Sequence, residues 1–116
     1  RPGHQDAWMA ATKAYKAAAA RSAPSASWRT YDVVAGAPGG TFLIFSSVGA
    51  FAEFDRMMAE GEATWKGMTA EESAALGKFM KEGLLTTTTN RYRLDPVQSY
   101  VNAETKAMDP AFWAKK

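Results

Sequence analysis

The feature that most constrains the fold of this chain is a turn-rich segment between two stretches typical of β-strands. Residues 28–34 are rich in aromatic and β-branched side chains, which fit a pleated surface, and residues 41–48 resume that character. Between them, residues 35–40 (AGAPGG) hold three glycines and one proline, which permit or preset the backbone angles of turns. Two such runs joined by a short glycine-containing loop predict a β-hairpin.

The second strand of this hairpin is apolar at four successive positions, residues 42–45 (FLIF). Because successive side chains of a strand point to opposite faces of a sheet, such a run needs cover on both faces. Helices of the same chain can cover one face. A chain of 116 residues has few elements left for the other face. The pattern therefore predicts that a second sheet, from a partner subunit or a sister domain, packs there.

Helices are predicted on both sides of the hairpin. Residues 6–21 carry an inward stripe at spacings of three and four, and Asp6 suits the N-cap or the first turn. A second helix is predicted over residues 48–60, capped by Ser46 or Ser47 and ended by Gly61. The stripe of the first helix consists of Trp8, Ala11, Tyr15, Ala18 and Ser22, and that of the second of Phe51, Phe54 and Met58.

A third helix is predicted to begin at a capping box. Thr69 and Glu72 have the required spacing, and Gly83 follows as the C-terminal stop. We expect residues 86–94 (TTTTNRYRL) to form a third strand, which is polar and therefore lies at an edge or lines a wet site. After an irregular stretch, Asp109 and Pro110 predict one last helical turn, with Asp as the cap and Pro at the first helical position.

The resulting order is helix, strand, strand, helix, helix, strand. One strand added in front would give βαββαβ, the split-βαβ or ferredoxin-like plan of the α+β class. The prediction is therefore an α+β ferredoxin-like domain with an antiparallel sheet over residues 1–96, whose first, central strand is absent from this piece. Residues 97–116 are predicted to be a tail that docks on the body or on a partner.

Three segments carry a resemblance to a known group of proteins. Residues 1–4 (RPGH) open a helix, residues 28–45 hold the central hairpin, and residues 91–96 (RYRLDP), followed by residues 99–100, give a final strand and exit. Together they resemble the dimeric α/β-barrel superfamily, which includes antibiotic-biosynthesis-type monooxygenases and NIPSNAP-like proteins. The resemblance is nearest to uncharacterised bacterial proteins with two such domains in tandem, in which this piece would be the second. It implies two ferredoxin-like sheets packed face to face.

The composition excludes several classes of function. The net charge of +2, from 14 basic and 12 acidic residues, predicts neither a nucleic-acid nor a membrane-surface partner. No apolar run approaches the roughly 20 residues that cross a bilayer. The chain has no cysteine, which removes disulfides and thiolate chemistry. Because it begins at Arg1 and not at Met, we expect a processed or excised piece; the compartment stays open, export with a removed targeting segment included.

Metal, nucleophilic and phosphate chemistry each lack a necessary part. His4 is the only histidine, so a metal site would need several carboxylates, and the acids fall at exposed-looking helix positions. The many serines could pair only with His4, and none lies in a nucleophile-elbow pattern. The glycine-rich loop leads into a strand, and no Lys-Ser/Thr pair follows it, so it is no phosphate cradle. We therefore expect no metal, no cofactor and no catalytic constellation.

A sheet of this kind can serve to bind RNA or a small molecule. An RNA-recognition sheet would expose stacking aromatics, and Arg29, Arg91 and Arg93 are suggestive, but the basic-Gly-aromatic signature is absent. In the superfamily that the chain resembles, a small-molecule cleft lies between the sheet and its helices. The candidate pocket residues are Trp28, Tyr31, Asn90, Arg91 and Tyr92.

The sequence thus predicts a structural or small-molecule-binding domain. The alternative is a cofactor-independent monooxygenase or isomerase that acts on a small apolar substrate. An enclosed cavity of roughly 300 Å³ or more with converging polar groups would favour the enzyme, and a filled core would favour the non-catalytic domain.

Overall fold

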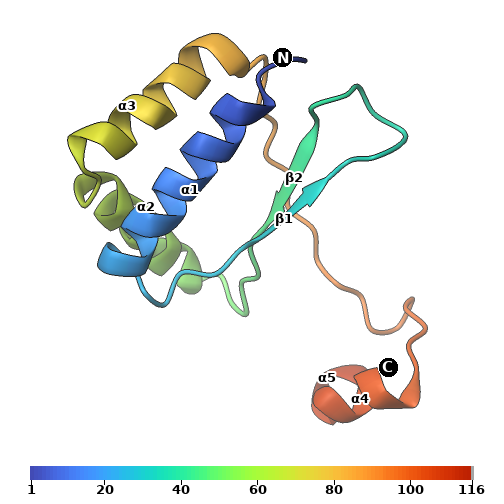
Figure 1. The fold of residues 1–116 in the computed structure, drawn as a ribbon. Helices are drawn as coiled ribbons and strands as arrows, with labels where there is room; N and C mark the ends of the chain where they lie inside the picture. Colours follow the sequence, from blue (N-terminus) through green and yellow to red (C-terminus); the bar gives the residue numbers. More distant parts are fainter. Residues whose placement is uncertain (116) are drawn as a thin grey trace. The chain divides into compact units, whose positions relative to one another are not determined.

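The helix α1 (Gln5–Ser22) is the element against which the other helices of the first half of the chain pack. The computed structural model describes residues 1–115 as an α+β structure, which confirms the predicted class. Two compact units divide the chain, Arg1–Thr86 and the residues from Thr87 onward. In the first unit, α1 lies alongside α2 (Glu53–Lys66) and α3 (Ala70–Lys78) (Figure 1). That residues 1–96 form one ferredoxin-like domain stays a prediction.

The sequence of α1 explains both its stability and its close packing. Alanine has the highest helix propensity, and Ala11, Ala18 and Ala19 are buried where α1 meets its neighbours. Thr12 points its hydroxyl back along the helix and donates to the carbonyl of Trp8 at 2.9 Å. The helix that was predicted over residues 6–21 is confirmed, with Asp6 in the first turn.

The second predicted helix is present, but it begins and ends later in the chain than predicted. α2 begins at Glu53, passes through Gly61 and ends at the C-cap Gly67. Neither Ser46 nor Ser47 caps it, because residues 46–52 precede the helix; instead the carboxylate of Glu53 accepts a hydrogen bond from the backbone N–H of Gly49 at 2.8 Å. The predicted inner stripe is also wrong, since Phe51 is 88% and Met58 is 73% exposed.

The α2–α3 junction follows the sequence pattern closely. The side chain of Thr69 accepts from the backbone N–H of Glu72, and the carboxylate of Glu72 accepts from the backbone N–H of Thr69 at 2.9 Å. The predicted capping box is therefore confirmed. α3 continues directly into a π-helical turn, η1 (Phe79–Gly83), which ends at the predicted stop, Gly83.

The predicted hairpin is present, with strands shorter than the apolar runs. β1 (Arg29–Asp32) pairs with β2 (Phe42–Phe45) in an antiparallel two-stranded sheet, with Tyr31 opposite Leu43 and Asp32 opposite Phe42. Alternation places Phe42 and Ile44 on one face of the sheet and Leu43 and Phe45 on the other.

The helices meet the face of the sheet that carries Phe42. The ring of Trp8, from α1, stacks on Phe42 with ring centroids 4.5 Å apart and also contacts Phe79 of η1 at 5.2 Å. We call the opposite face, which carries Arg29, Tyr31, Leu43 and Phe45, the outer sheet face; in the first unit no helix covers it (Figure 1).

The third predicted strand is wrong. In the described chain, residues 85–94 form neither helix nor strand. A polar segment of this kind gains little by burial and is held in a sheet chiefly by a neighbouring strand. The ferredoxin-like plan would place it beside the first strand, and residues 1–115 contain no such strand. Among the described residues, no strand is therefore available to form a sheet with this segment.

The second unit holds two short helices, each begun by a side-chain cap. Asn102 accepts from the backbone N–H of Thr105 at the start of α4 (Ala103–Met108), a helix that the sequence reading missed. Asp109 accepts from the backbone N–H of Phe112 at the start of α5 (Pro110–Trp113), as predicted. The rings of Phe112 and Trp113 meet edge to face at 5.0 Å. The docking of this tail stays a prediction.

Candidate functional site

A cavity of about 220 Å³ lies within the first unit, between the loop after α1, the residues that follow β2, and the middle of α2. Each element reaches it for a local reason. The loop begins where α1 stops at Ala23, and the backbone N–H of Ala26 turns back to donate to the carbonyl of Ala23 at 2.9 Å. That turn brings Ser25 and Trp28 to the cavity wall.

The polar side of the cavity is an interlocked set of three side chains. Ser25 donates its hydroxyl hydrogen to Oε1 of Glu60 at 2.7 Å, and Nη1 of Arg56 donates to the same oxygen at 3.2 Å. Arg56 also lies 3.6 Å from Oε2 of Glu53. Arg56 and Glu60 are four residues apart on α2, so the helix itself sets their approach. The single positive charge of Arg56 thus lies between two carboxylates, those of Glu60 and Glu53.

Aromatic rings and a buried hydroxyl form the rest of the wall. Tyr15 of α1 meets Trp28 edge to face at 5.7 Å and Trp65 at 6.4 Å, so one tyrosine links the loop to α2. Thr64 is buried, and its hydroxyl donates to the carbonyl of Glu60 at 2.8 Å, which leaves no unsatisfied polar atom there. The site offers a small space with aromatic edges and hydroxyls.

The predicted pocket residues fall in different places. Trp28 lines the cavity and is half-buried, whereas Tyr31 lies on the outer sheet face, edge to face with Phe45 at 5.7 Å. Asn90, Arg91 and Tyr92 are exposed residues of the second unit. Their role in a pocket stays a prediction.

Sequence reasoning missed the residues that make the cavity polar. Glu60 belongs to the acids that the sequence places at exposed-looking helix positions, and its spacing of four from Arg56 is visible in the sequence. The pairing of Ser25 with Glu60 joins residues that are 35 positions apart and depends on the turn after α1. No local sequence pattern predicts such a contact.

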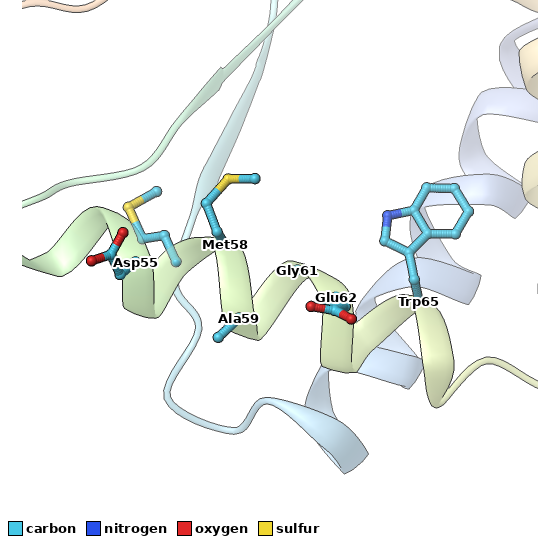
Figure 2. A pocket seen from close by; sticks show the side chains of 7 residues that line it. Asp55, Met58, Ala59, Gly61, Glu62 and Trp65 are labelled. Atoms are coloured by element: carbon cyan, nitrogen blue, oxygen red, sulfur yellow. The ribbon is translucent and has the colours of Figure 1, made fainter.

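A second hollow lies along α2 itself. Asp55, Met58, Glu62 and Trp65 project from one helix, and Figure 2 shows that the residues around the hollow all belong to this helix. A surface lined by one helix cannot enclose a small molecule. Its exposed methionine, tryptophan and carboxylates form an open face and not a binding pocket.

An ion pair outside the cavity joins α1 to α3. Arg21, in the last turn of α1, donates to both carboxylate oxygens of Glu72, at 3.0 and 2.6 Å, and to the carbonyl of Gly67 at 3.1 Å. The hydrogen bond from Arg21, supported by the backbone N–H of Thr69, lowers the pKa of Glu72 below its ordinary value. The hydrogen bond to Glu72 in turn raises the pKa of Arg21.

Neither a metal cluster nor a serine–histidine pair lies at the cavity among the described residues. Residues 1–115 contain no group of three or more His, Cys, Asp or Glu side chains arranged to hold a metal ion. His4 is the N-cap of α1, and Tyr15 lies eleven residues further on, roughly 16 Å along the helix at 1.5 Å per residue. Ser25 therefore has no histidine beside it, and Glu60 already accepts two hydrogen bonds.

Comparison with known proteins adds no identification. No family model, no curated protein and no solved structure matches the chain. Among the helices of residues 1–115, none combines the length and the apolar character needed to span a bilayer. The geometry of the chain is therefore the basis for its proposed function.

Proposed function

We propose that this chain is a non-catalytic structural domain of the dimeric α/β-barrel type, which associates through its outer sheet face and has room for a small ligand. A second copy of the chain, or a sister domain with the same sheet, covers that face. The observation that carries the proposal is the exposure of Tyr31, Leu43 and Phe45 on one face of the sheet, at 52%, 46% and 46%.

The outer sheet face has the composition of an interface. Three large apolar or aromatic side chains stand together, and Arg29 is the one charged residue among the four. Tyrosine and arginine are among the residues enriched in protein interfaces and their hot spots. Monomeric soluble proteins rarely expose large contiguous apolar patches, so a partner is the simplest cover for this one.

The interior of the first unit supports the same conclusion. Its buried apolar residues are all alanines, Ala11, Ala18, Ala19 and Ala23, while the larger apolar side chains of the hairpin remain outside. Burial of a large apolar side chain contributes roughly 1.5–3 kcal/mol, whereas alanine contributes much less. A partner sheet over Leu43 and Phe45 would provide the burial that the single chain lacks.

The arrangement of elements is consistent with a ferredoxin-like domain. A hairpin with helices on one face and nothing on the other is half of a layered structure, and such layers are stable only when both apolar sides are buried. Two such sheets packed face to face complete it. An interface of this kind would bury more than about 2,000 Å² in total, as obligate dimers do.

Sedimentation equilibrium at micromolar concentration tests the proposal. We expect the wild-type chain to be a dimer and Tyr31→Lys, which places a charge on the outer sheet face, to be a monomer. Thr30→Lys is the matched control, because Thr30 is an exposed neighbour in the same strand on the opposite face. A wild-type monomer, or a Tyr31→Lys dimer, would overturn the association of two copies through this face; circular dichroism verifies that each variant is folded.

The alternative function, a cofactor-independent monooxygenase or isomerase, is favoured only by the cavity beside Trp28. That cavity, about 220 Å³, is smaller than the roughly 300 Å³ at which ligand pockets begin. Its polar groups are also engaged with one another. Oxygen uptake with a panel of small phenols tests the monooxygenase. We expect none, and uptake that is lost in a folded Glu60→Gln variant would establish the enzyme instead.

A further inference from the structure

We infer that the outward side of α2 is a docking site for one α-helix of a different protein, a basic amphipathic helix whose Lys or Arg residues recur every seven positions. The site, which we call the α2 seam, consists of Asp55, Met58, Glu62 and Trp65. It lies on a helix and not on the sheet, so the inference goes beyond the proposed association and does not rest on it.

The spacing of the α2 seam is that of a helix that pairs with another helix. Its members follow one another at intervals of three, four and three residues, which is the a/d repeat of coiled coils. Residues at these intervals share one face of a helix, and Figure 2 shows Met58 and Trp65 on the same side of α2. From position 55 to position 65 the seam is about 15 Å long at 1.5 Å per residue, which a partner helix of three turns would match.

The α2 seam is the side of the helix that its own unit leaves uncovered. Thr64, which is buried, and Glu60, which lines the cavity, lie on the opposite side. Met58 and Trp65 are 73% and 55% exposed. The ring of Trp65 nevertheless meets that of Tyr15 edge to face at 6.4 Å, so its position is set without a partner. A partner that covers it therefore loses little affinity to ordering this side chain.

The hollow along the seam fits one apolar side chain of a partner. The small residues Ala59 and Gly61 flank the seam between Met58 and Trp65, and a Cβ added to Gly61 would meet nothing within 4 Å. In paired helices, a side chain of one helix inserts into a hole formed by four residues of the other. The occupant therefore carries an apolar residue such as leucine opposite this hollow.

The charges of the α2 seam require the rest of the occupant to be basic. Within residues 1–115, Asp55 makes no hydrogen bond or ion pair, and Glu62 pairs only with Lys66, at 2.6 Å. The side chains of that pair are 67% and 75% exposed, and exposed pairs contribute little, so Glu62 stays available to a partner. The two carboxylates are seven residues apart. Lys or Arg residues seven apart on the occupant would face both.

The same charge pattern disfavours a second copy of the chain as the occupant. A second α2 would bring its own carboxylates to the seam, and like charges across an interface cost affinity. The exposed lysines of α1, Lys13 and Lys16, are three residues apart, whereas the acids of the seam are seven apart, so the two rows do not match. The occupant is therefore a helix of another protein.

Titration with a defined helical peptide tests the inference. The probe is an acetylated and amidated peptide of three Lys-Ala-Ala-Leu-Ala-Gln-Gln heptads, longer than the roughly 12–15 residues that a helix in water needs. The control peptide has Glu in place of each Lys. In nitrogen-edited NMR spectra we expect the Lys peptide to shift the indole N–H signal of Trp65 with a dissociation constant below about 1 mM, and to leave those of Trp8 and Trp28 in place. The Glu peptide should shift none of them.

A charge-swapped variant separates the α2 seam from general attraction between charges. In Asp55→Lys/Glu62→Lys we expect the Lys peptide to bind at least about tenfold more weakly and the Glu peptide to bind in its place. The matched control is Asp6→Lys/Glu71→Lys, which makes the same change of net charge at two exposed acids outside the seam. It should bind the Lys peptide as wild type does, and circular dichroism verifies that both variants are folded.

Three results would overturn the inference: no shift of the Trp65 signal at about 1 mM of the Lys peptide, an equal loss of binding in the control variant, or a shift of this signal with protein concentration when no peptide is added. The last result would identify a second copy as the occupant. Repeating the titration in Tyr31→Lys separates the two proposals. We expect unchanged affinity there, and a loss would contradict the independence of the α2 seam from the outer sheet face.

Discussion

Gly67, the C-cap of α2, lies tightly against Ser22 at the end of α1. A Cβ at this position would lie 1.8 Å from the hydroxyl oxygen of Ser22 and 2.9 Å from its Cβ, so only glycine permits the contact. At Gly61, in the interior of α2, a Cβ would meet nothing within 4 Å. Packing against Ser22 therefore requires glycine at position 67, whereas no neighbouring atom requires glycine at position 61.

Alanine substitutions should reveal this difference. We expect Gly67→Ala to lower the free energy of unfolding by about 2 kcal/mol, because it overpacks the helix contact. Gly61→Ala should raise it by up to about 1 kcal/mol, because alanine is the better helix former. Urea denaturation measures both. Ser22→Gly should relieve the cost of Gly67→Ala in a double-mutant cycle, and additive effects of the two substitutions would contradict the proposed clash.

The Arg21–Glu72 pair predicts a dependence of stability on pH. The pKa of Glu72 is lowered in the folded chain relative to its ordinary value of 4.5, so its contribution is present above that value and is lost as pH falls through the folded pKa. Glu72→Gln keeps a side chain suited to the capping box but removes the charge. We expect its melting temperature to lie below that of wild type at pH 7 and to equal it at acid pH.

The control for the charge substitution lies on the same helical turn. Glu71→Gln also removes a carboxylate near the start of α3, but Glu71 is exposed and does not contact Arg21. A melting-temperature difference for Glu72→Gln that persists unchanged at low pH would show that the ion pair contributes nothing.

At the scale of elements, the sequence predicts the helices and the hairpin whose formation depends on local signals. α1 follows from alanine content and a regular stripe, and α3 follows from a capping box between residues three apart. The hairpin follows from its turn, whose Gly36 and Gly40 adopt positive φ of 83° and 82°. In each case the decisive groups lie within a few residues of one another.

The elements that the sequence misplaced depend on distant partners. Gly61 has the appearance of a stop, yet α2 continues to Lys66 because Thr64 is buried and Gly67 fits against Ser22 of α1. Residues 86–94 have strand composition but form no strand, because a strand needs a neighbour. The cavity shows the same limit: Ser25, Arg56 and Glu60 meet there only because the turn after α1 reaches the middle of α2, and no local pattern connects them.

At the scale of the whole molecule, the proposed association predicts that stability depends on concentration. The buried apolar residues of the first unit are alanines, which contribute little, and the outer sheet face is exposed in the single chain. If folding and association are linked in this way, mass action requires the apparent melting temperature to rise with protein concentration.

Thermal unfolding at two concentrations measures this linkage. A hundredfold increase in concentration adds about 2.7 kcal/mol per dimer, or roughly 1.4 kcal/mol per chain. For a domain near 100 residues this corresponds to a rise of roughly 5–10 °C in melting temperature. We expect such a rise for wild type and Thr30→Lys between 2 and 200 μM (about two decades), and none for Tyr31→Lys, because its charge cannot enter a dry interface. A melting temperature of wild type that does not move across this range would mean that the chain is stable alone, with its apolar sheet face in water.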